Sequence, residues 1–419
     1  MPASRRDSGA REEWASGWPL AFVSALGIAV SVTALYSLGA LLSPIQAATG
    51  WSRSEISAGP AFLTVGAVLF GPAVGALVDQ NGSRTIALAG LAFYCAALAS
   101  ISLLGSSLTG WLVGWCLIAI GYVAVKPTVW AAAVVKRFEQ SRGLALGLVL
   151  SGTGIGSALS PLGATILSEM VGWRATYAWM AAGCAILTLP LVFAFFHDRL
   201  DTDGGSQSVA VKSANYPAAE SRTQIIFSPA FLLMGLACLL SALPSGALVV
   251  HFVPILAEQD IAARTAAFVA GFVGIFTVVG RLAAGAVMDR VQPVWIGVGS
   301  CIAALLACVI LLAAHGKIWA GLAASLLGLS AGAEFGVLAY MIPQLFGHRH
   351  FGFLFGIMSA IFTLAVGVGP LIAGIVFDIF GTYSVFMAGA MPSYLIASVC
   401  FLLLRKPRAR PLSHAVAER

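Results

Sequence analysis

The sequence predicts an all-α integral membrane protein of about twelve transmembrane helices, arranged as two pseudo-symmetric halves of six. Four observations lead to this fold class. Apolar residues make up 59% of the 419 residues and charged residues only 10%, a composition too apolar for a water-soluble protein of this size. The apolar runs reach about 20 residues, enough for a helix to cross a hydrocarbon core of roughly 30 Å. They lack the alternation of barrel strands, and a four-part repeat divides them.

The apolar runs define the expected spans in chain order. They contain many internal Gly and Ala residues, which suit close packing of membrane helices. The expected spans are residues 18–46, 55–78, 85–105, 109–135, 143–168, 174–196, 229–257, 265–288, 294–314, 317–342, 353–377 and 383–404. The long polar connection after the sixth span has the composition of a flexible linker. The expected organisation is an N-terminal tail at 1–17, a six-helix half at 18–196, a cytoplasmic linker at 197–228, a second half at 229–404 and a tail at 405–419.

The distribution of cations predicts the orientation. With a cytoplasmic N-terminus, the inside segments hold seventeen of the 23 Lys and Arg residues and the outside loops hold four, with two inside spans. The positive-inside rule then predicts a multi-pass protein of the cell inner membrane with both termini cytoplasmic. The seven cysteines all fall in spans and show no metal spacing, so we expect core residues, with no metal site and no cofactor.

An internal repeat relates the spans. An acid followed three residues later by Gly ends three units, at Asp79, Glu169 and Asp378, and Asp289 is a degenerate fourth member. The separations from 79 to 169 and from 289 to 378 are each about 90 residues, and those from 79 to 289 and from 169 to 378 are each about 210. This spacing predicts three-span units repeated four times, as in nested transporter repeats with a midplane site between the halves.

Three charged residues lie deep in expected spans: Lys126, Arg281 and Glu334. An ionised side chain in hydrocarbon costs at least about 2.5 kcal/mol on insertion scales, so each needs a partner, a water-filled cavity or a substrate. Two cations and one acid leave a surplus positive charge, which favours an organic anion as substrate. The alternative is a permanent ion pair between Arg281 and Glu334, with Lys126 reaching to the cytoplasmic face.

One histidine and four aromatic residues complete the candidate site. His251 is expected near the outer end of the seventh span, as a proton-linked or substrate residue or as a hydrogen-bonded helix contact. Stacking or hydrogen bonding to a substrate is the functional interpretation of Tyr36, Tyr122, Trp130 and Tyr340, and helix packing is the alternative.

Several motifs resemble the major facilitator superfamily. Gly75-Ala-Leu-Val-Asp79-Gln-Asn-Gly82-Ser-Arg84 resembles its signature loop between the second and third spans, and Gly285…Asp289-Arg290 resembles the counterpart in the second half. Three further stretches are similar to the bacterial monocarboxylate and oxalate:formate group of that superfamily: Gly50-Trp-Ser-Arg-Ser-Glu-Ile56, Arg142-Gly-Leu-Ala-Leu-Gly147, and Phe346-Gly347…Phe355-Gly356 followed by Gly369-Pro370.

The signature loops indicate a gate. An acid at a helix end beside an arginine can pair across the two halves and so bias which side of the protein is closed. We therefore expect Asp79, Arg84, Asp289 and Arg290 to act in gating, not in substrate recognition.

The resemblance also implies roles for individual site residues. In the resembled group a basic residue of the eighth span, which matches Arg281, is implicated in binding the carboxylate. The animal monocarboxylate carriers have an acid one helical turn earlier, where this chain has Thr277, and a lysine in the first span, where this chain has Tyr36 and small hydroxyl residues. Glu334 or His251 is then left to carry a coupled proton.

The predicted function is secondary active transport of a small organic anion, a mono- or dicarboxylate that can be aromatic, by alternating access with proton coupling. The expected partners are this anion, a proton and the lipid bilayer, with no nucleic acid, and the expected state is a monomer. The alternatives are an anion exchanger or exporter on the same fold and, from another class, a non-transporting membrane receptor. An enzyme is not expected, because no reactive constellation stands out in the spans.

Overall fold

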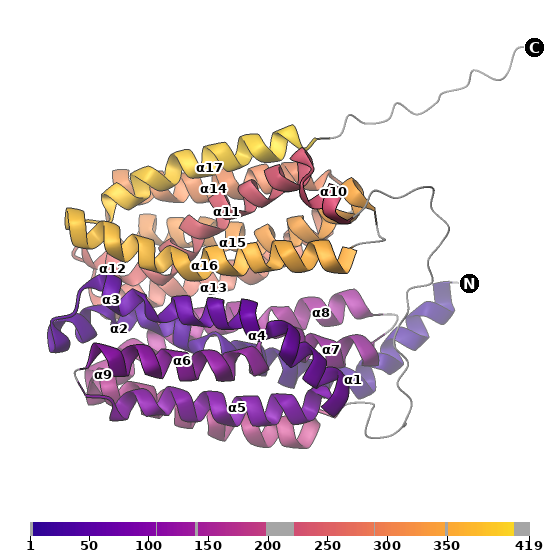
Figure 1. Cartoon of the computed structure of the whole chain (residues 1–419), viewed down its shortest axis with the longest axis horizontal. Helices are drawn as coiled ribbons and strands as arrows, with labels where there is room; N and C mark the ends of the chain where they lie inside the picture. The colour runs from indigo at the N-terminus through magenta and orange to yellow at the C-terminus, as the bar shows by residue number, and fades with distance from the viewer. Residues whose placement is uncertain are drawn as a thin grey trace, which may run out of the picture.

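The secondary structure that the computed structural model describes is entirely helical, and its helices run side by side along the long axis of the molecule (Figure 1). The structure describes residues 3–105, 107–138, 141–197, 222–288, 290–347 and 351–405. In these residues eleven helices are long and apolar enough to cross a membrane. The longest, Leu144–Phe195, has 52 residues and turns at Gly172, where φ is 79°, so it holds two spans. Twelve spans result, as the predicted fold class requires.

The first bundle, here called the N-terminal bundle, comprises α1 to α9. Its helices are α1 (Ala3–Ser31), α2 (Thr33–Thr49), α3 (Arg53–Ser57), α4 (Gly59–Asn81), α5 (Ser83–Ser100), the 3-10 turn η1 (Ile101–Leu103), α6 (Leu108–Val125), α7 (Pro127–Arg137), α8 (Arg142–Leu150) and α9 (Gly152–Phe195). A buried cluster of apolar side chains fills this bundle, with Trp111, Trp115 and Trp130 among its largest members.

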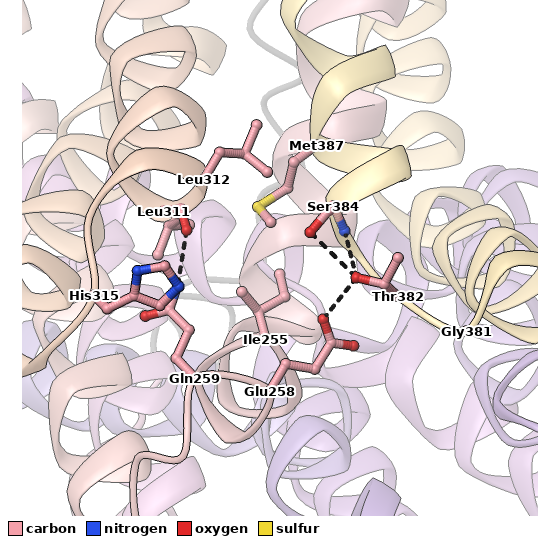
Figure 2. A pocket seen from close by; sticks show the side chains of 10 residues that line it. All are labelled: Ile255, Glu258, Gln259, Leu311, Leu312, His315, Gly381, Thr382, Ser384 and Met387. Atoms are coloured by element: carbon pink, nitrogen blue, oxygen red, sulfur yellow. Dashed lines mark hydrogen bonds between the residues drawn. The ribbon is translucent and has the colours of Figure 1, made fainter.

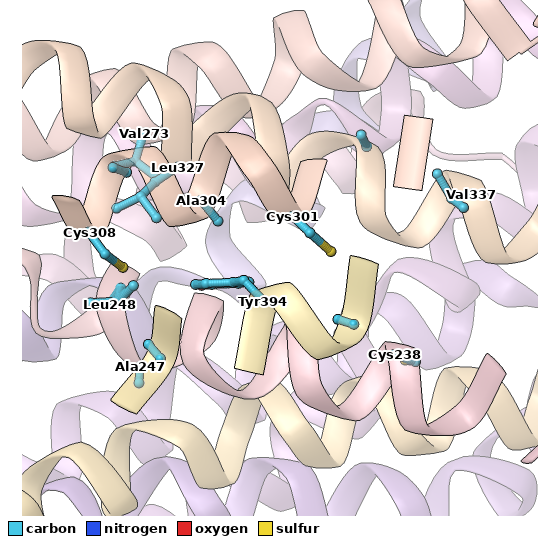
Figure 3. Packing of buried hydrophobic residues seen from close by; sticks show 14 of the residues in the cluster. Cys238, Ala247, Leu248, Val273, Cys301, Ala304, Cys308, Leu327, Val337 and Tyr394 are labelled. Carbon is cyan, nitrogen blue, oxygen red and sulfur yellow. The ribbon is translucent and has the colours of Figure 1, made fainter. Parts of the chain in front are cut away.

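The second, C-terminal bundle comprises α10 to α17 and has a separate buried cluster. Its helices are α10 (Arg222–Ile226), α11 (Pro229–Val250), α12 (Phe252–Ala257), α13 (Ala263–Met288), α14 (Pro293–Ala313), α15 (Lys317–Phe346), α16 (Phe351–Phe380) and α17 (Ser384–Leu403). Figure 3 shows part of this core, with Tyr394 of α17 lying beside Cys301 and Cys308 of α14. All seven cysteines are free and are buried or half-buried, so they pack as small core residues.

Five predicted spans are interrupted by short breaks in the helix. The breaks fall at Val32, Ala58, Lys126, Ser151 and His251, which separate α1 from α2, α3 from α4, α6 from α7, α8 from α9 and α11 from α12. Hydropathy does not reveal such breaks, because the composition of the run continues across them. Non-helical backbone at membrane depth is tolerated where protein buries it or where it lines an aqueous cavity.

The segment predicted as an N-terminal tail is part of the bundle where the structure describes it. Helix α1 begins at Ala3 and continues without interruption into the first span. The Trp14 ring lies 5.0 Å from that of Phe138, and Arg137 Nη2 donates a hydrogen bond of 2.5 Å to Ser16 Oγ. Most of the predicted linker, residues 198–221, and nearly all of the predicted C-terminal tail, residues 406–419, lie outside the described residues.

The two bundles meet on one side of the molecule and diverge on the other (Figure 1). We call the side where α1 begins and α17 ends the near side, and the side where α2 ends and α3 begins the far side. Hydrogen bonds join the bundles on the far side, from Arg53 and Ser54 to Asp378 and from Arg264 to Glu169. Toward the near side, residues 73–77 of α4 are exposed or half-buried.

At mid-depth the bundles touch through α9 and α13, where two glycines face each other. A Cβ added at Gly274 would lie 2.3 Å from the Gly154 carbonyl oxygen and 2.4 Å from the Ala158 amide nitrogen. Backbone atoms cannot rotate away as a flexible side chain can, so only glycine permits this approach. Small residues at such crossings let membrane helices pack closely.

Gly274→Ala should therefore destabilise the protein by about 1–3 kcal/mol, the usual cost of overpacking. Thermal denaturation of the purified protein would show this as a lower melting temperature. Gly183→Ala on α9 is the matched control, because an added Cβ there meets no atom within 4 Å. An unchanged melting temperature for Gly274→Ala would show that the helices can separate without cost.

Candidate functional site

Arg281 lies on α13 and reaches across the interface to the N-terminal bundle. Its Nη1 donates to the Leu150 carbonyl oxygen and, at 3.0 Å, to Thr153 Oγ1. Helix α8 ends at Leu150, and the amide of Gly154 donates to Ser151 instead of completing the helical bond to Leu150. The break in span five thus presents a carbonyl to the guanidinium, and Arg281 joins the two bundles at this break.

Lys126 lies at the break between α6 and α7. Its backbone has φ −64° and ψ 159°, and Pro127 follows as the first residue of α7. Proline disfavours helical backbone in the residue before it and has no N–H to donate, which explains the break. The Lys126 ammonium lies against Gly71 of α4, since a Cβ added at Gly71 would be 2.6 Å from Nζ. No described carboxylate forms an ion pair with Lys126.

Two of the predicted tyrosines lie near these cations. Tyr36 on α2 is half-buried and lies near Arg281, and Tyr122 on α6 is half-buried and lies near Tyr36. Tyr122 also lies one helical turn before Lys126, the residue that follows the last residue of α6. We call Tyr36, Tyr122, Lys126, Thr153 and Arg281 the central cluster.

The other two aromatic candidates lie apart from the central cluster. Trp130 is fully buried, packs 5.0 Å from the Phe196 ring, and donates through Nε1 to the Val125 carbonyl oxygen at 2.7 Å. That carbonyl belongs to the last residue of α6, so the indole satisfies an acceptor left open by the break. Tyr340 is 37% exposed and lies on the near-side part of α15.

Glu334 is buried in the C-terminal bundle and does not pair with Arg281. Its Oε1 accepts hydrogen bonds from Ser245 Oγ at 2.8 Å and from Ser330 Oγ at 3.2 Å. Ser245 Oγ also lies 3.1 Å from the Tyr394 hydroxyl. Because the single Ser245 proton goes to the carboxylate, Tyr394 donates to Ser245, and a chain of hydroxyls leads to Glu334.

The packing of α13 against α15 explains why the expected ion pair does not form. The two helices touch at Gly332, where an added Cβ would lie 2.2 Å from the Thr277 carbonyl oxygen. Arg281 extends from this contact toward α8 and α9, whereas Glu334 extends toward α11 and α17. The two charges therefore have neighbouring backbones and different partners.

His251 lies at the break between α11 and α12 and is fully buried. Its Nε2 is 3.0 Å from the Pro370 carbonyl oxygen and 3.3 Å from Ser57 Oγ, and its Nδ1 is 2.6 Å from the Tyr383 hydroxyl. A carbonyl can only accept, so Nε2 carries a proton, and in the neutral ring Nδ1 accepts from Tyr383. Ser57 belongs to the other bundle, so His251 lies at the far-side interface.

The structure describes two of the four predicted gating side chains. Arg84 Nη2 donates to the Phe193 carbonyl oxygen at 2.8 Å, a contact within the N-terminal bundle. Arg290 is exposed just beyond the near-side end of α13. The side chain of Asp79 and the whole of Asp289 lie outside the described residues.

Sequence reasoning did not select the acids that contact the opposite bundle on the far side. Asp378 and Glu169 were recognisable only as repeat markers, Arg264 only as a cation of the outside loops, and Arg53 as such a cation within the Gly50–Ile56 motif. The pairing could have been anticipated from the repeat, since equivalent acids end equivalent spans.

A separate cavity of about 320 Å³ lies on the far side within the C-terminal bundle. Figure 2 shows Glu258, Gln259 and His315 around the cavity, with the Thr382 hydroxyl donating a hydrogen bond to Glu258. None of the predicted site residues lines this cavity, so it is distinct from the central cluster.

The sequence profile described as the Major Facilitator Superfamily matches residues 24–339 and 322–418 of the chain. The 3-(3-hydroxy-phenyl)propionate transporter of Escherichia coli (strain K12) is 26% identical over 359 residues, which cover 81% of this chain and 83% of that protein. The riboflavin transporter RibJ of Trypanosoma cruzi (strain CL Brener) is 34% identical over 117 residues. That match covers 28% of this chain and only 25% of RibJ.

Two solved transporter structures share the fold. The nucleoside transporter NupG superposes with a TM-score of 0.75 at 12% identity, over 93% of this chain and 99% of that one. A bacterial homolog of the human lysosomal transporter Spinster, in an inward-facing and unoccupied conformation, gives a TM-score of 0.68 at 16% identity, over 95% and 99%. At these identities the likeness concerns the fold alone.

Trp130→Phe should lower stability by about 1–3 kcal/mol, because it leaves the buried Val125 carbonyl without its donor. Thermal denaturation measures this loss. Trp179→Phe is the control, since Trp179 is 60% exposed. A Trp130→Phe protein of normal stability with weakened substrate binding would instead identify the indole as a substrate contact.

Proposed function

Because the chain belongs to the Major Facilitator Superfamily and is a multi-pass membrane transporter, we propose that it carries a small organic anion across the bilayer by alternating access, in symport with a proton. The proposed substrate is an aromatic monocarboxylate. The second candidate substrates are mono- and dicarboxylates without an aromatic ring.

The observation that carries the proposal is the pair of membrane-embedded cations in the central cluster. Among the described residues, the protein contacts of Arg281 use one nitrogen, which leaves N–H groups on its other nitrogens for a ligand. Arginine presents five donors in a planar fork that suits bidentate binding of a carboxylate. Lys126 adds a second positive charge without a described carboxylate partner, so an anion would neutralise charge that the protein leaves uncompensated.

The tyrosines of the central cluster support an aromatic substrate. The Escherichia coli relative transports a propionate that carries a hydroxyphenyl ring, which combines a carboxylate with an aromatic group. Tyr36, which lies near Arg281, and Tyr122, which lies near Tyr36, offer ring faces and hydroxyl groups. We propose that the carboxylate binds Arg281 and Lys126 while the substrate ring lies against these tyrosines.

The distribution of charge supports an orientation. The positive-inside rule assigns the near side to the cytoplasm and both termini with it, in the cell inner membrane. The far side, where the bundles are joined, then faces outward, and this conformation is the inward-facing member of the transport cycle.

Glu334 is the proposed proton carrier. It is a buried acid with only hydroxyl partners among the described residues, and its helix touches that of Arg281 at Gly332. A change in the charge of Glu334 would therefore act on the helix pair that holds Arg281, the cation proposed to bind the substrate. His251 is the competing carrier, because its ring also accepts a proton.

Arg281→Ala should weaken binding of 3-(3-hydroxyphenyl)propionate at least tenfold, since hydrogen bonds to charged groups contribute about 1.5–3 kcal/mol. Isothermal titration calorimetry of protein in lipid nanodiscs measures the Kd. Arg281→Lys keeps the charge but loses the fork, so an intermediate Kd is expected.

Lys317→Ala is the control for this series, because it removes an exposed cation at the start of α15. Thermal denaturation confirms that each variant is folded. An unchanged Kd in folded Arg281→Ala protein would remove Arg281 from the site. Binding of only neutral or cationic compounds by the unmodified protein would contradict the anion proposal as a whole.

Glu334→Gln should abolish the dependence of uptake on a pH gradient while leaving substrate counterflow intact. The amide keeps the oxygen that accepts from Ser245 and Ser330 but cannot release a proton. Uptake into proteoliposomes is compared with and without an inward proton gradient, and His251→Gln is measured in parallel. Gradient-driven uptake that persists in Glu334→Gln and disappears in His251→Gln would transfer the role to His251.

A further inference from the structure

Two contacts between the bundles on the far side occupy equivalent positions in the repeat. Glu169 ends span five and contacts Arg264 at the start of span eight, with Oε2 to Nη2 at 2.6 Å. Asp378 ends span eleven and contacts Arg53 and Ser54 at the start of span two. In each case the repeat acid of one bundle meets the first turn of a helix of the other.

The Asp378 contact is a helix cap supplied by the opposite bundle. Its Oδ1 accepts from the Arg53 amide at 2.9 Å and its Oδ2 accepts from the Ser54 amide at 2.8 Å. These are the first two amides of α3, which have no acceptor within the helix. The positive end of the helix favours a carboxylate at this place.

The Arg53 side chain forms a second part of the same contact. Its guanidinium lies 3.5 Å from the centre of the Phe377 ring and 5.1 Å from that of the Tyr383 ring. Phe377 immediately precedes Asp378, so two adjacent residues of α16 hold the backbone and the side chain of Arg53. Cation–π attraction adds to the cap without competing for the carboxylate.

Tyr383 is in turn fixed by other helices. Its hydroxyl donates to His251 Nδ1 at 2.6 Å, and its amide donates to Glu258 Oε2 at 3.2 Å. Figure 2 shows that Glu258 also accepts a hydrogen bond from the hydroxyl of Thr382, the residue before Tyr383. The Tyr383 ring beside Arg53 is therefore held in place by His251 at the break and by Glu258 at the end of α12.

From this arrangement we infer that Arg53, Ser54, Phe377, Asp378 and Tyr383 form the far-side latch, the gate that must open before substrate reaches the site from the far side. The inference rests on the transport role of the chain, not on the identity of its substrate. Asp378 and the Glu169–Arg264 pair are both exposed to solvent, but Asp378 accepts hydrogen bonds from two backbone amides whereas Glu169 accepts one from a long side chain, so the Glu169–Arg264 pair is the weaker companion.

Spin-label distance measurements test the latch without any substrate. Labels are placed at Thr109 and Lys317, which are exposed near the far-side starts of α6 and α15, in full-length protein whose seven native cysteines have been replaced. In lipid nanodiscs the parent protein should give predominantly one short distance. Asp378→Ala should raise the population with a longer distance by roughly tenfold, since it removes two charge-assisted hydrogen bonds between the bundles.

Three comparisons make the result specific. Asp260→Asn is the matched control, because it neutralises a far-side acid whose φ of 58° suits asparagine, and it should leave the distance unchanged. Glu169→Gln should give a smaller increase than Asp378→Ala. Labels at Ala47 and Thr109, both in the N-terminal bundle, should report the same distance in every variant.

An unchanged distance distribution in Asp378→Ala would overturn the latch. If the Ala47–Thr109 distance also changes in Asp378→Ala, that variant is misfolded. The latch is then tested with the milder variants Asp378→Asn and Arg53→Lys. Arg53→Lys keeps the charge and removes the planar stacking, so it should also raise the long-distance population. A population unchanged in both of these variants would likewise overturn the latch.

Discussion

A guanidinium inside a membrane protein must be satisfied, and the way Arg281 is satisfied organises the centre of this molecule. Its partners are the Leu150 carbonyl and the Thr153 hydroxyl, both on the opposite bundle. That carbonyl is available because span five breaks at Ser151. The buried cation, the break and the bundle interface therefore depend on one another, and moving the bundles apart at this point would take both of these hydrogen-bond partners away from the guanidinium.

The same constraint explains the aromatic side chains beside the other breaks. Tyr94 donates to the Ser31 carbonyl oxygen at 3.1 Å and accepts from the Ala34 amide at 3.2 Å. Its hydroxyl therefore satisfies backbone groups on both sides of the break at Val32. Trp130 donates to the Val125 carbonyl next to the break at Lys126. Backbone polar groups at membrane depth need partners inside the protein, so these buried rings make irregular helices possible around the central cluster.

The far side and the central cluster depend on different kinds of contact. At the centre, one arginine touches the opposite bundle through a carbonyl and a hydroxyl. On the far side, Asp378 caps a helix and Arg53 lies on two aromatic rings. The far-side contacts are the ones that alternating access would have to break, whereas the proposed substrate carboxylate would bind donors of Arg281 that its contacts with the described residues leave unused. Closure and binding are thus assigned to separate residues within one interface.

The sequence by itself determined the class of protein, the twelve spans, the repeat and the depth of Lys126, Arg281 and Glu334, because hydropathy and helical rise are local properties of the chain. Only the tertiary structure decided what each charge contacts. Depth along a helix does not tell which neighbouring helix a side chain faces, and the close packing of α13 on α15 directs Arg281 and Glu334 to different partners. Pro127 marks the break at Lys126 in the sequence, but the ring of Trp130 that satisfies the freed Val125 carbonyl lies next to it only after folding. Asp378 was visible as a repeat marker, but its contact with Arg53 joins positions 325 residues apart, and only the packing of the two bundles brings them together.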